Sequence, residues 1–263
     1  MVAMSDGTHN HRTWKEIIAA DPQHSRRYAN RWRGFVREGR DIDGEARLVD
    51  AMAPRHARIL DAGCGQGRVG GYLVKAGHQV MGVDVDPYLI DEAKRQFPDA
   101  TWLVGDLAQL SHVLDDGLEN TPHDDTAAAF DIIICPGNVL TFVAPEDRAK
   151  VLQGFAEVLN PEGGRVIVGF GAGRGWDFMD FETAAQETGL TVIQRYSTWN
   201  LRPFDDESQF LVAVLERTKW RGLGILSQQF FNLKLGRRLR SLAGHSDGSR
   251  GGRIVQNLAP LVR

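Results

Sequence analysis

The chain has 263 residues, of which 42% are hydrophobic and 25% charged, and this composition excludes a fibrous or wholly disordered protein. Such a length supports one main domain whose core needs no disulfide framework. The net charge of −3 is uneven, because residues 217–263 hold ten basic residues and one acidic residue. Their net +9 leaves −12 for residues 1–216, an asymmetry that concerns partners more than the fold.

The number and spacing of the cysteines, together with the hydropathy of the chain, indicate the cellular compartment in which the protein is expected. The only cysteines, Cys64 and Cys135, lie far apart without metal-ligand spacing, so neither a metal site nor a secreted disulfide scaffold is expected. The polar start lacks the apolar region of a secretory signal, and no apolar run reaches the roughly 18 residues that span a bilayer. We therefore expect a cytoplasmic protein that holds no metal.

Helical patterns come first along the chain, and we expect residues 1–57 to form a helical cap on the ligand side of the fold. These helices are expected at 14–20, 24–37 and 44–52. From residue 58, β-rich runs alternate with helical patterns, which predicts a doubly wound α/β fold with a mostly parallel sheet. The strands are expected at 58–62, 79–84, 101–105, 130–135 and 165–170. The helices that follow them are expected at 68–76, 87–97, 145–159 and 176–188.

The pattern changes toward the end of the chain. Residues 115–129, rich in Asp, Asn, Thr and Gly, are predicted to be a surface loop. Two strand patterns, 190–199 and 208–216, follow Gly189 with no helix between them, which predicts an antiparallel hairpin. We expect residues 58–216 to form the main domain.

Residues 217–263 are predicted to be a basic extension that is partly disordered. Leu223, Leu226, Phe230 and Leu233 recur at helical spacing just before a cluster of basic residues. A basic amphipathic helix of this kind could bind RNA or an anionic membrane surface. It could equally pack on the acidic body through its apolar face.

An apolar strand pattern runs straight into a glycine-rich turn and then into a helix. Gly63, Gly65 and Gly67 let the backbone turn sharply and approach a ligand closely. This turn resembles motif I of the class I S-adenosylmethionine-dependent methyltransferases, and the resemblance implies that Asp61 binds the ammonium group of the cofactor directly or through water. The stretch that begins at Gly65 also fits the G-x-G-x-x-G pattern of nicotinamide-binding folds.

Acidic residues follow the next two strands. Asp84 lies where a carboxylate can bind both ribose hydroxyls of an adenosine, or can simply cap the strand end. Val85 is apolar and can pack on the adenine ring. Asp106, which Leu107 follows, resembles the methyltransferase position that accepts a hydrogen bond from the adenine amino group. It can also be the N-cap of the next helix, but nicotinamide dehydrogenases do not usually need a carboxylate there.

The resemblance covers residues 58–216 and implies S-adenosyl-L-methionine as the cofactor. It also implies a seven-stranded, Rossmann-like sheet whose last strand runs against the others, and a cofactor contact through the backbone carbonyl of Cys135 or Pro136. The residues that it assigns to cofactor binding are Asp61, Gly63, Gly65, Gly67, Asp84, Val85, Asp106, Leu107 and Cys135. No catalytic residue is assigned, because positioning an acceptor beside an activated methyl can by itself lower a barrier by roughly 7–11 kcal/mol.

The methyl acceptor is expected at the carboxyl ends of the strands. The residues expected there, or in a lid above, are Asn138, Phe142, Gly171, Arg202, Trp199, Tyr28, Trp32 and Arg33. A small-molecule acceptor is the main hypothesis, because no separate macromolecule-binding module is visible. The alternatives are an RNA or protein methyltransferase, which the basic extension supports, and a nicotinamide-dependent oxidoreductase or a cofactor-binding protein without activity.

Overall fold

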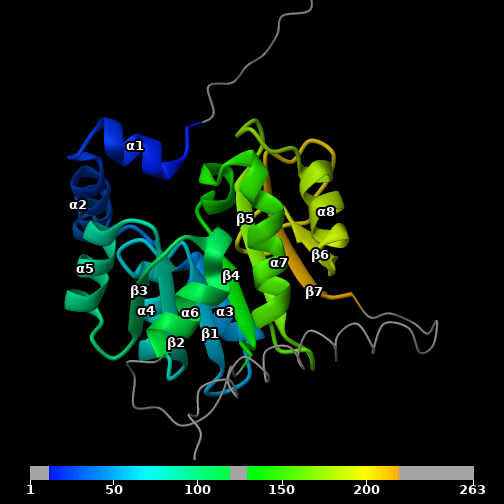
Figure 1. Cartoon of the computed structure of the whole chain (residues 1–263), viewed down its shortest axis with the longest axis horizontal. Coiled ribbons are helices and arrows are strands. Elements are labelled where there is room, and N and C mark those ends of the chain that lie inside the picture. The colour runs from blue at the N-terminus through cyan, green and yellow to red at the C-terminus, as the bar shows by residue number, and fades with distance from the viewer. Residues whose placement is uncertain (1–11, 119–128, 219–263) are drawn as a thin grey trace, which may run out of the picture. The chain divides into compact units, whose positions relative to one another are not determined.

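The computed structural model describes residues 12–118 and 129–218, and they belong to one compact unit that ends at Thr218. Their centre is a seven-stranded sheet of order β3-β2-β1-β4-β5-β7-β6 (Figure 1). β7 pairs antiparallel with β5 and β6, and the remaining pairs are parallel. The strands are β1 Arg58–Ala62, β2 Gln79–Asp84, β3 Thr101–Val104, β4 Ile132–Cys135, β5 Arg165–Gly171, β6 Leu190–Tyr196 and β7 Phe210–Arg217. The predicted fold class is confirmed.

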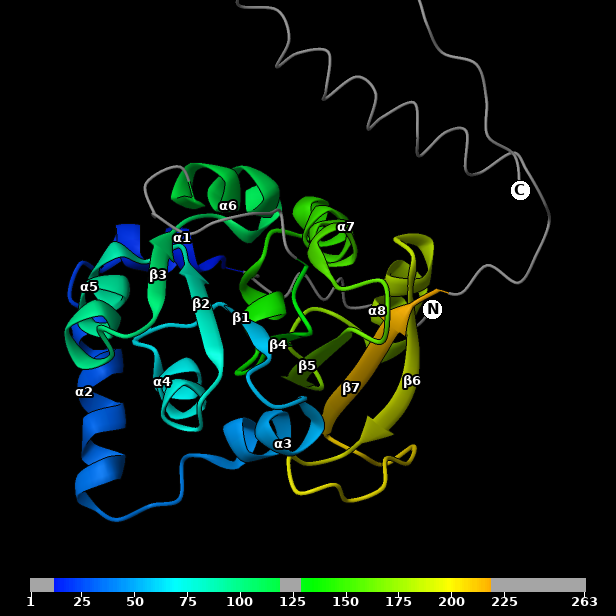
Figure 2. The same cartoon turned by 90° about the horizontal axis from the view of Figure 1, so that it is seen from below.

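Helices cover both faces of the sheet, with α6 and α7 on one face and α3 and α4 on the other (Figure 2). The α-helices are α1 Trp14–Ala20, α2 His24–Arg37, α3 Gly44–Met52, α4 Arg68–Lys75, α5 Pro87–Gln96, α6 Leu110–Leu118, α7 Arg148–Val158 and α8 Phe178–Glu187. Short 3-10 turns are η1 Leu107–Gln109, η2 Val139–Phe142 and η3 Pro145–Asp147. Because both faces are covered, a central strand such as β4 is buried at all four of its positions.

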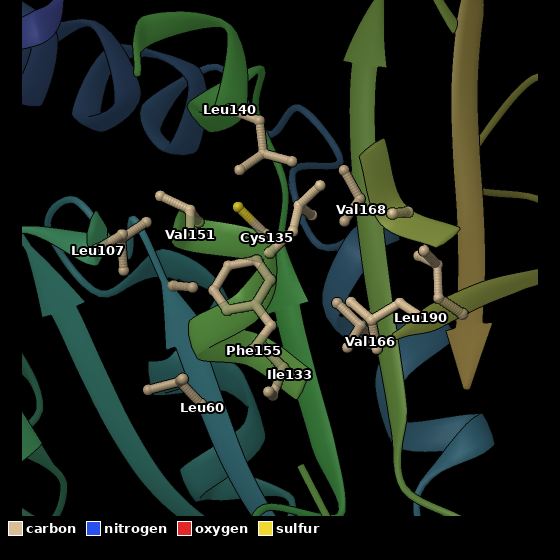
Figure 3. Close-up of a cluster of buried hydrophobic side chains, with 14 of the residues drawn as sticks. Leu60, Leu107, Ile133, Cys135, Leu140, Val151, Phe155, Val166, Val168 and Leu190 are labelled. Carbon is tan, nitrogen blue, oxygen red and sulfur yellow. The ribbon is translucent and has the colours of Figure 1, made fainter. Parts of the chain in front are cut away.

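The main apolar cluster lies between the sheet and α7. Phe155 of α7 is fully buried there beside Ile133 and Cys135 of β4 (Figure 3). A second cluster packs α3 and α4 against the opposite face through residues such as Val49 and Leu73. These two clusters hold the strands in register, so the carboxyl ends of β1, β2 and β4 are presented together at one edge of the sheet.

Some predicted boundaries are wrong. Residues 115–118 belong to α6 rather than to a loop, because Leu110 and Leu114 bury one face of that helix. The helix predicted at 145–159 begins with a 3-10 turn, and the strand predicted at 190–199 ends at Tyr196. The remainder of the predicted loop, residues 119–128, and the predicted basic extension from residue 219 onward lie outside the described residues. Within residues 12–118 and 129–218, the helices are too short or too polar to cross a membrane.

Candidate cofactor-binding site

A cavity of about 1050 Å³ lies at the carboxyl ends of the strands, where open α/β sheets bind their ligands. This volume lies just above the usual range for small-molecule and cofactor sites, roughly 300–1,000 Å³. Its floor consists of the ends of β1, β2 and β4, and its walls come from α1, α2, η2 and the segment after β6. The cavity therefore has room for a nucleotide-sized ligand together with a second, smaller molecule.

The glycine turn between β1 and α4 forms part of the floor. Gly63, Gly65 and Gly67 all have positive φ angles, of 76°, 54° and 79°, in the left-handed region that glycine enters without strain. A Cβ at position 63 would lie 2.4 Å from Cγ1 of Val139, so the first glycine is needed for packing. At position 65 the nearest atom, Cε1 of Tyr28, would lie at 3.7 Å, so this part of the turn is open toward the cavity.

Asp61 lies at the end of β1 and is only 1% exposed. Its Oδ2 accepts a hydrogen bond of 2.8 Å from the backbone N–H of Gly70. Its Oδ1 is buried and has no hydrogen-bond partner among the described residues. Burial raises the pKa of Asp61 to about 7. A cationic donor that reached this carboxylate would supply the missing partner and favour its charged form.

Asp84, at the end of β2, holds the glycine turn in place. Its Oδ2 accepts from the N–H of Gly65 at 2.8 Å, and its Oδ1 accepts from the N–H of Asp86 at 2.9 Å. Burial raises the pKa of Asp84 to about 6. Each carboxylate oxygen has further acceptor capacity, so the same side chain can also receive hydrogen bonds from a pair of ligand hydroxyls.

Asp106 follows β3 and is already bonded to the protein on both oxygens. Oδ1 accepts from the N–H of Ala108 at 2.9 Å, as expected for an N-cap, and Oδ2 pairs with Lys15 of α1. Partial burial disfavours the charge of Asp106, but the hydrogen bonds from Lys15 and Ala108 hold its pKa below the ordinary value. The N-cap role is therefore present, and a ligand amino group would share this carboxylate with Lys15.

The cavity brings together most of the residues that the sequence assigns to the cofactor. Those that line it are Asp61, Gly63, Gly65, Asp84, Val85, Asp106 and Leu107. Gly67 and Cys135 do not line it. A Cβ at Gly67 would lie 2.9 Å from Trp102, so this glycine allows close packing behind the turn. The thiol of Cys135 lies in the apolar core (Figure 3), where burial raises its pKa, and the neighbouring Pro136 lines the cavity instead.

The residues expected near the acceptor divide in the same way. Those that line the cavity are Asn138, Phe142, Trp199, Tyr28 and Trp32, whereas Gly171, Arg202 and Arg33 do not. Arg33 instead pairs with Glu92 of α5. Asn138 has a φ angle of 67°, and its Oδ1 accepts from the N–H of Gly171 at 2.8 Å. Its turn-forming role is therefore observed together with its place at the cavity.

Trp14 of α1 is a cavity residue that the sequence reasoning missed. Its Nε1 donates to Oδ2 of Asp86 at 2.9 Å, and its ring packs edge-on against Tyr28 and Phe142. Ser25 donates to the same carboxylate oxygen. The contact between Trp14 and Asp86 spans 72 positions, so no local pattern indicates it. The capping box of Thr13 and Glu16 indicates only where the helix begins.

The described residues include no group of three or more His, Cys, Asp or Glu side chains that could hold a metal ion. The polar groups at the strand ends suit an organic ligand. Three carboxylates, Asp61, Asp84 and Asp106, follow one another across the ends of adjacent strands beside the open glycine turn. A ligand with an ammonium group, a ribose and an adenine amino group carries donors that match these three acceptors in that order.

A doubly wound sheet with a reversed β7, a glycine turn after β1 and carboxylates along the strand ends defines a Rossmann-like domain for a nucleoside-containing cofactor. A TehB-like S-adenosylmethionine-dependent methyltransferase of Corynebacterium glutamicum, of known structure, is 48% identical and has a TM-score of 0.67. The alignment covers 75% of this chain and 100% of that one. A profile of the methyltransferase domain family matches residues 59–163. The chain therefore belongs to the S-adenosylmethionine-dependent methyltransferases, which confirms the resemblance and the cofactor.

Curated relatives align over part of their length. Magnesium-protoporphyrin O-methyltransferase of Rhodobacter capsulatus is 30% identical over 149 residues, which are 54% of this chain and 56% of that protein. tRNA 5-carboxymethoxyuridine methyltransferase of Escherichia coli strain K12 is 35% identical over 123 residues, 47% of this chain and 42% of that protein. The chain thus spans about half the length of these relatives, whose names state acceptors of different kinds.

Proposed function

We propose that the chain binds S-adenosylmethionine in this cavity and transfers its methyl group to a small-molecule acceptor. The observation that carries the proposal is the buried carboxylate of Asp61, at the floor of a large cavity, whose Oδ1 lacks a partner among the described residues. An isolated buried charge is costly, and the ammonium group of the cofactor would neutralise it. The enclosure of the cavity by α1, α2 and the segment after β6 supports a small acceptor.

The geometry of the cavity supports the following cofactor contacts. Asp61 binds the ammonium group, and Gly63 and Gly65 leave space for the amino-acid end, while Gly67 allows the turn behind them to pack. Asp84 binds the ribose hydroxyls. Val85 and Leu107 contact the adenine ring, Asp106 accepts from its amino group, and the strand end at Cys135 and Pro136 contributes backbone carbonyls.

When bound, S-adenosylmethionine supplies a methyl group that its sulfonium already activates. The chain must therefore hold an acceptor atom in line with that methyl group and exclude water. Such positioning can lower the activation barrier by roughly 7–11 kcal/mol. Trp14, Tyr28 and Phe142 form an edge-to-face aromatic cluster at the cavity and would limit the access of water. Asn138 and Trp199 lie where the acceptor would bind.

The proposal includes a division of the chain and a compartment. Residues 1–57 would act as a cap that closes the cavity, residues 58–216 as the methyltransferase domain and residues 217–263 as an extension. The lining residues contributed by α1 and α2 support the role of the cap. Cys64 and Cys135 are both unpaired and buried, and unpaired cysteines fit a reducing cytoplasm.

Calorimetric titration of the purified chain with S-adenosylhomocysteine and with NADH tests the cofactor assignment. We expect binding of S-adenosylhomocysteine and none of NADH. The acceptor is then tested by incubating the chain with methyl-labelled cofactor and fractions of small metabolites, or of RNA. Transfer of label to a small molecule supports the proposal, and transfer to RNA alone contradicts the acceptor class.

Asp84→Ala is expected to weaken S-adenosylhomocysteine binding by roughly 1–3 kcal/mol, because it removes hydrogen bonds to a charged acceptor. Calorimetry measures this loss, and circular dichroism checks that the variant is folded. Asp205→Ala, a substitution of an exposed residue that does not line the cavity, is the control and should bind like the parent. A folded Asp84→Ala variant with undiminished affinity would refute the ribose assignment.

RNA is the second candidate acceptor, because residues 217–263 carry a net +9 and one relative is named as a tRNA methyltransferase. Removing residues 219–263 is expected to leave the affinity for S-adenosylhomocysteine unchanged, since every proposed cofactor contact lies before residue 137. If RNA is the acceptor, the same truncation should weaken RNA binding and reduce its dependence on salt. Loss of cofactor binding by a folded truncated chain would show that the proposed division is mistaken.

A further inference from the structure

Two glycines near the end of β5 leave one face of this strand bare. Gly169 and Gly171 are two positions apart, so they lie on the same face of the sheet, about 7 Å from each other. A Cβ at Gly169 would clash with the indole ring of Trp199, which therefore lies directly on the strand. A Cβ at Gly171 would lie 3.6 Å from Nε of Arg174 and 3.6 Å from Oδ1 of Asn138. The bare face thus lets three cavity-lining side chains gather at this strand end.

These three side chains carry hydrogen-bond donors that the protein does not use. Oδ1 of Asn138 accepts from the N–H of Gly171, so the other end of the amide, Nδ2, is left to donate, and it has no partner among the described residues. The guanidinium of Arg174 and the indole N–H of Trp199 likewise donate to none of them. All three donors are therefore available to a molecule in the cavity.

The carboxylates of the cavity lie elsewhere. Asp61, Asp84 and Asp106 lie at the ends of β1, β2 and β3. The remaining lining carboxylates of the described chain are engaged by a cation or by the capping box of α1, and they are Glu16, Glu45 and Asp147. The part of the cavity above β5 therefore holds donors and a positive charge.

The other basic side chains that line the cavity are engaged as well. Lys15 pairs with Asp106, and Arg68 pairs with Glu45. The guanidinium of Arg31 lies over the ring of Tyr28, 5.1 Å from its centroid. Arg174 is exposed and has no such neighbour among the described residues. It is therefore the cation best placed to receive an anionic group of a ligand.

We propose that Arg174 and Asn138 form a subsite for a carboxylate of the methyl acceptor. This inference rests on the proposed function and names the class of acceptor within it. The planar guanidinium matches the two oxygens of a carboxylate, and Nδ2 of Asn138 supplies a further donor. One unpaired cation balances the single charge of a carboxylate but not the charge of about two on a phosphate monoester. The rings of Trp199 and Phe210, whose centroids are 6.2 Å apart, suit an apolar body beside the carboxylate.

Pools of small metabolites that differ in charge test the acceptor class. A metabolite extract is separated by anion exchange at neutral pH into a retained and an unretained pool. Each pool is then incubated with the full-length chain and methyl-labelled S-adenosylmethionine, and the initial rate of labelling is measured. A second sample of the retained pool is treated with a phosphatase beforehand, which distinguishes acceptors with a phosphate from acceptors with a carboxylate.

Three variants and one control locate the subsite. The variants are Arg174→Gln, Arg174→Lys and Asn138→Asp, of which the last keeps an acceptor for the N–H of Gly171. Arg55→Gln is the matched control, because the side chain of Arg55 is 77% exposed and precedes β1, at the amino ends of the strands. Calorimetric titration with S-adenosylhomocysteine shows whether the cofactor site is intact, and thermal unfolding checks the fold of each variant.

The parent is expected to label the retained pool with or without phosphatase treatment. Arg174→Gln should lower the rate by roughly 10- to 100-fold, as for the loss of hydrogen bonds to a charged group. Arg174→Lys keeps the charge without the planar fork and should have an intermediate rate. The new carboxylate in Asn138→Asp would pair with Arg174, so this variant should lose at least as much. Both Arg174 variants should bind S-adenosylhomocysteine like the parent, and Arg55→Gln should match the parent in both measurements.

Labelling of the unretained pool by the parent, or equal rates for the parent and Arg174→Gln, would overturn the proposal. Loss of labelling after phosphatase treatment would also overturn it, because the acceptor would then carry a phosphate. The same holds if Arg174→Gln weakens S-adenosylhomocysteine binding, or if Arg55→Gln loses as much activity. Failure of the parent to bind S-adenosylhomocysteine or to label any pool would be a different result, since it would remove the proposed function itself.

Discussion

Gly65→Val is expected to abolish S-adenosylhomocysteine binding, with an affinity loss on the order of 100-fold or more, while the chain still folds. The φ angle of 54° at this position disfavours a β-branched residue by roughly 1–2 kcal/mol. The Cβ itself meets only ordinary contacts, with Tyr28 at 3.7 Å and Leu89 at 4.0 Å. The two methyl groups beyond it would fill space in the cavity that the proposed cofactor site requires. Calorimetry measures the affinity.

A control for Gly65→Val needs a valine at another glycine that has a positive φ angle but lies away from the cavity. Gly163 has a φ angle of 84°, and a Cβ there would meet nothing within 4 Å. It lies in the turn before β5, away from the cavity. Gly163→Val should therefore lose a similar free energy of unfolding and keep the full affinity for the cofactor. If both variants bind equally well, Gly65 is not at the cofactor site.

Asp61→Asn is expected to weaken the binding of S-adenosylhomocysteine by about 2–5 kcal/mol at pH 8, which is the range for removing one partner of a buried charge pair. The amide keeps an acceptor for the N–H of Gly70 but loses the charge that the ammonium requires. Because burial raises the pKa of Asp61 to about 7, the affinity of the parent should rise as the pH passes through this value. The affinity of the variant should lack that rise. Equal affinities at pH 8 would remove Asp61 from the cofactor site.

The same substitution predicts a pH-dependent change in stability without ligand. An unfolded aspartate titrates near pH 3.9, so between about pH 4 and pH 7 the folded parent binds more protons than the unfolded chain. Its free energy of unfolding therefore falls as the pH rises through this window. Asp61→Asn lacks this titration and should gain stability relative to the parent until the difference levels off above pH 7. Urea unfolding at several pH values measures this difference, with the exposed Asp206→Asn as the control.

Local patterns predict the core of the fold well. The apolar runs of β1 and β2 match their observed bounds, because buried parallel strands require nearly continuous hydrophobic residues. Asp86 caps α5 with its side chain, and Pro87 occupies the first turn, as local capping rules predict. Asp84 ends β2 and Asp106 follows β3, and the carboxyl ends of parallel strands meet at one edge of the sheet. Both residues therefore line the cavity at that edge.

Local sequence patterns do not predict the structure where contacts between residues far apart in the sequence determine it. The Asp115, Asp116 and Gly117 composition favours a loop, but burial of Leu110 and Leu114 on α7 and the sheet makes the segment a helix. The pairing of Asp106 with Lys15 spans 91 positions, and no periodicity reveals it. The sequence also places Cys135 at a strand end without showing that its side chain lies on the core face.

The matched family profile leaves part of the cavity wall outside its range. It covers residues 59–163, which include the glycine turn and the three carboxylates, but Trp14, Tyr28 and Trp199 line the same cavity from outside that range. Asp86, two residues after Asp84, is hydrogen-bonded to Trp14 and Ser25. Two carboxylates of the matched range, Asp86 and Asp106, therefore hold α1 at the cavity through Trp14 and Lys15. Substitutions in α1 can therefore reshape the side of the cavity that faces the carboxylates without changing any residue of the matched range.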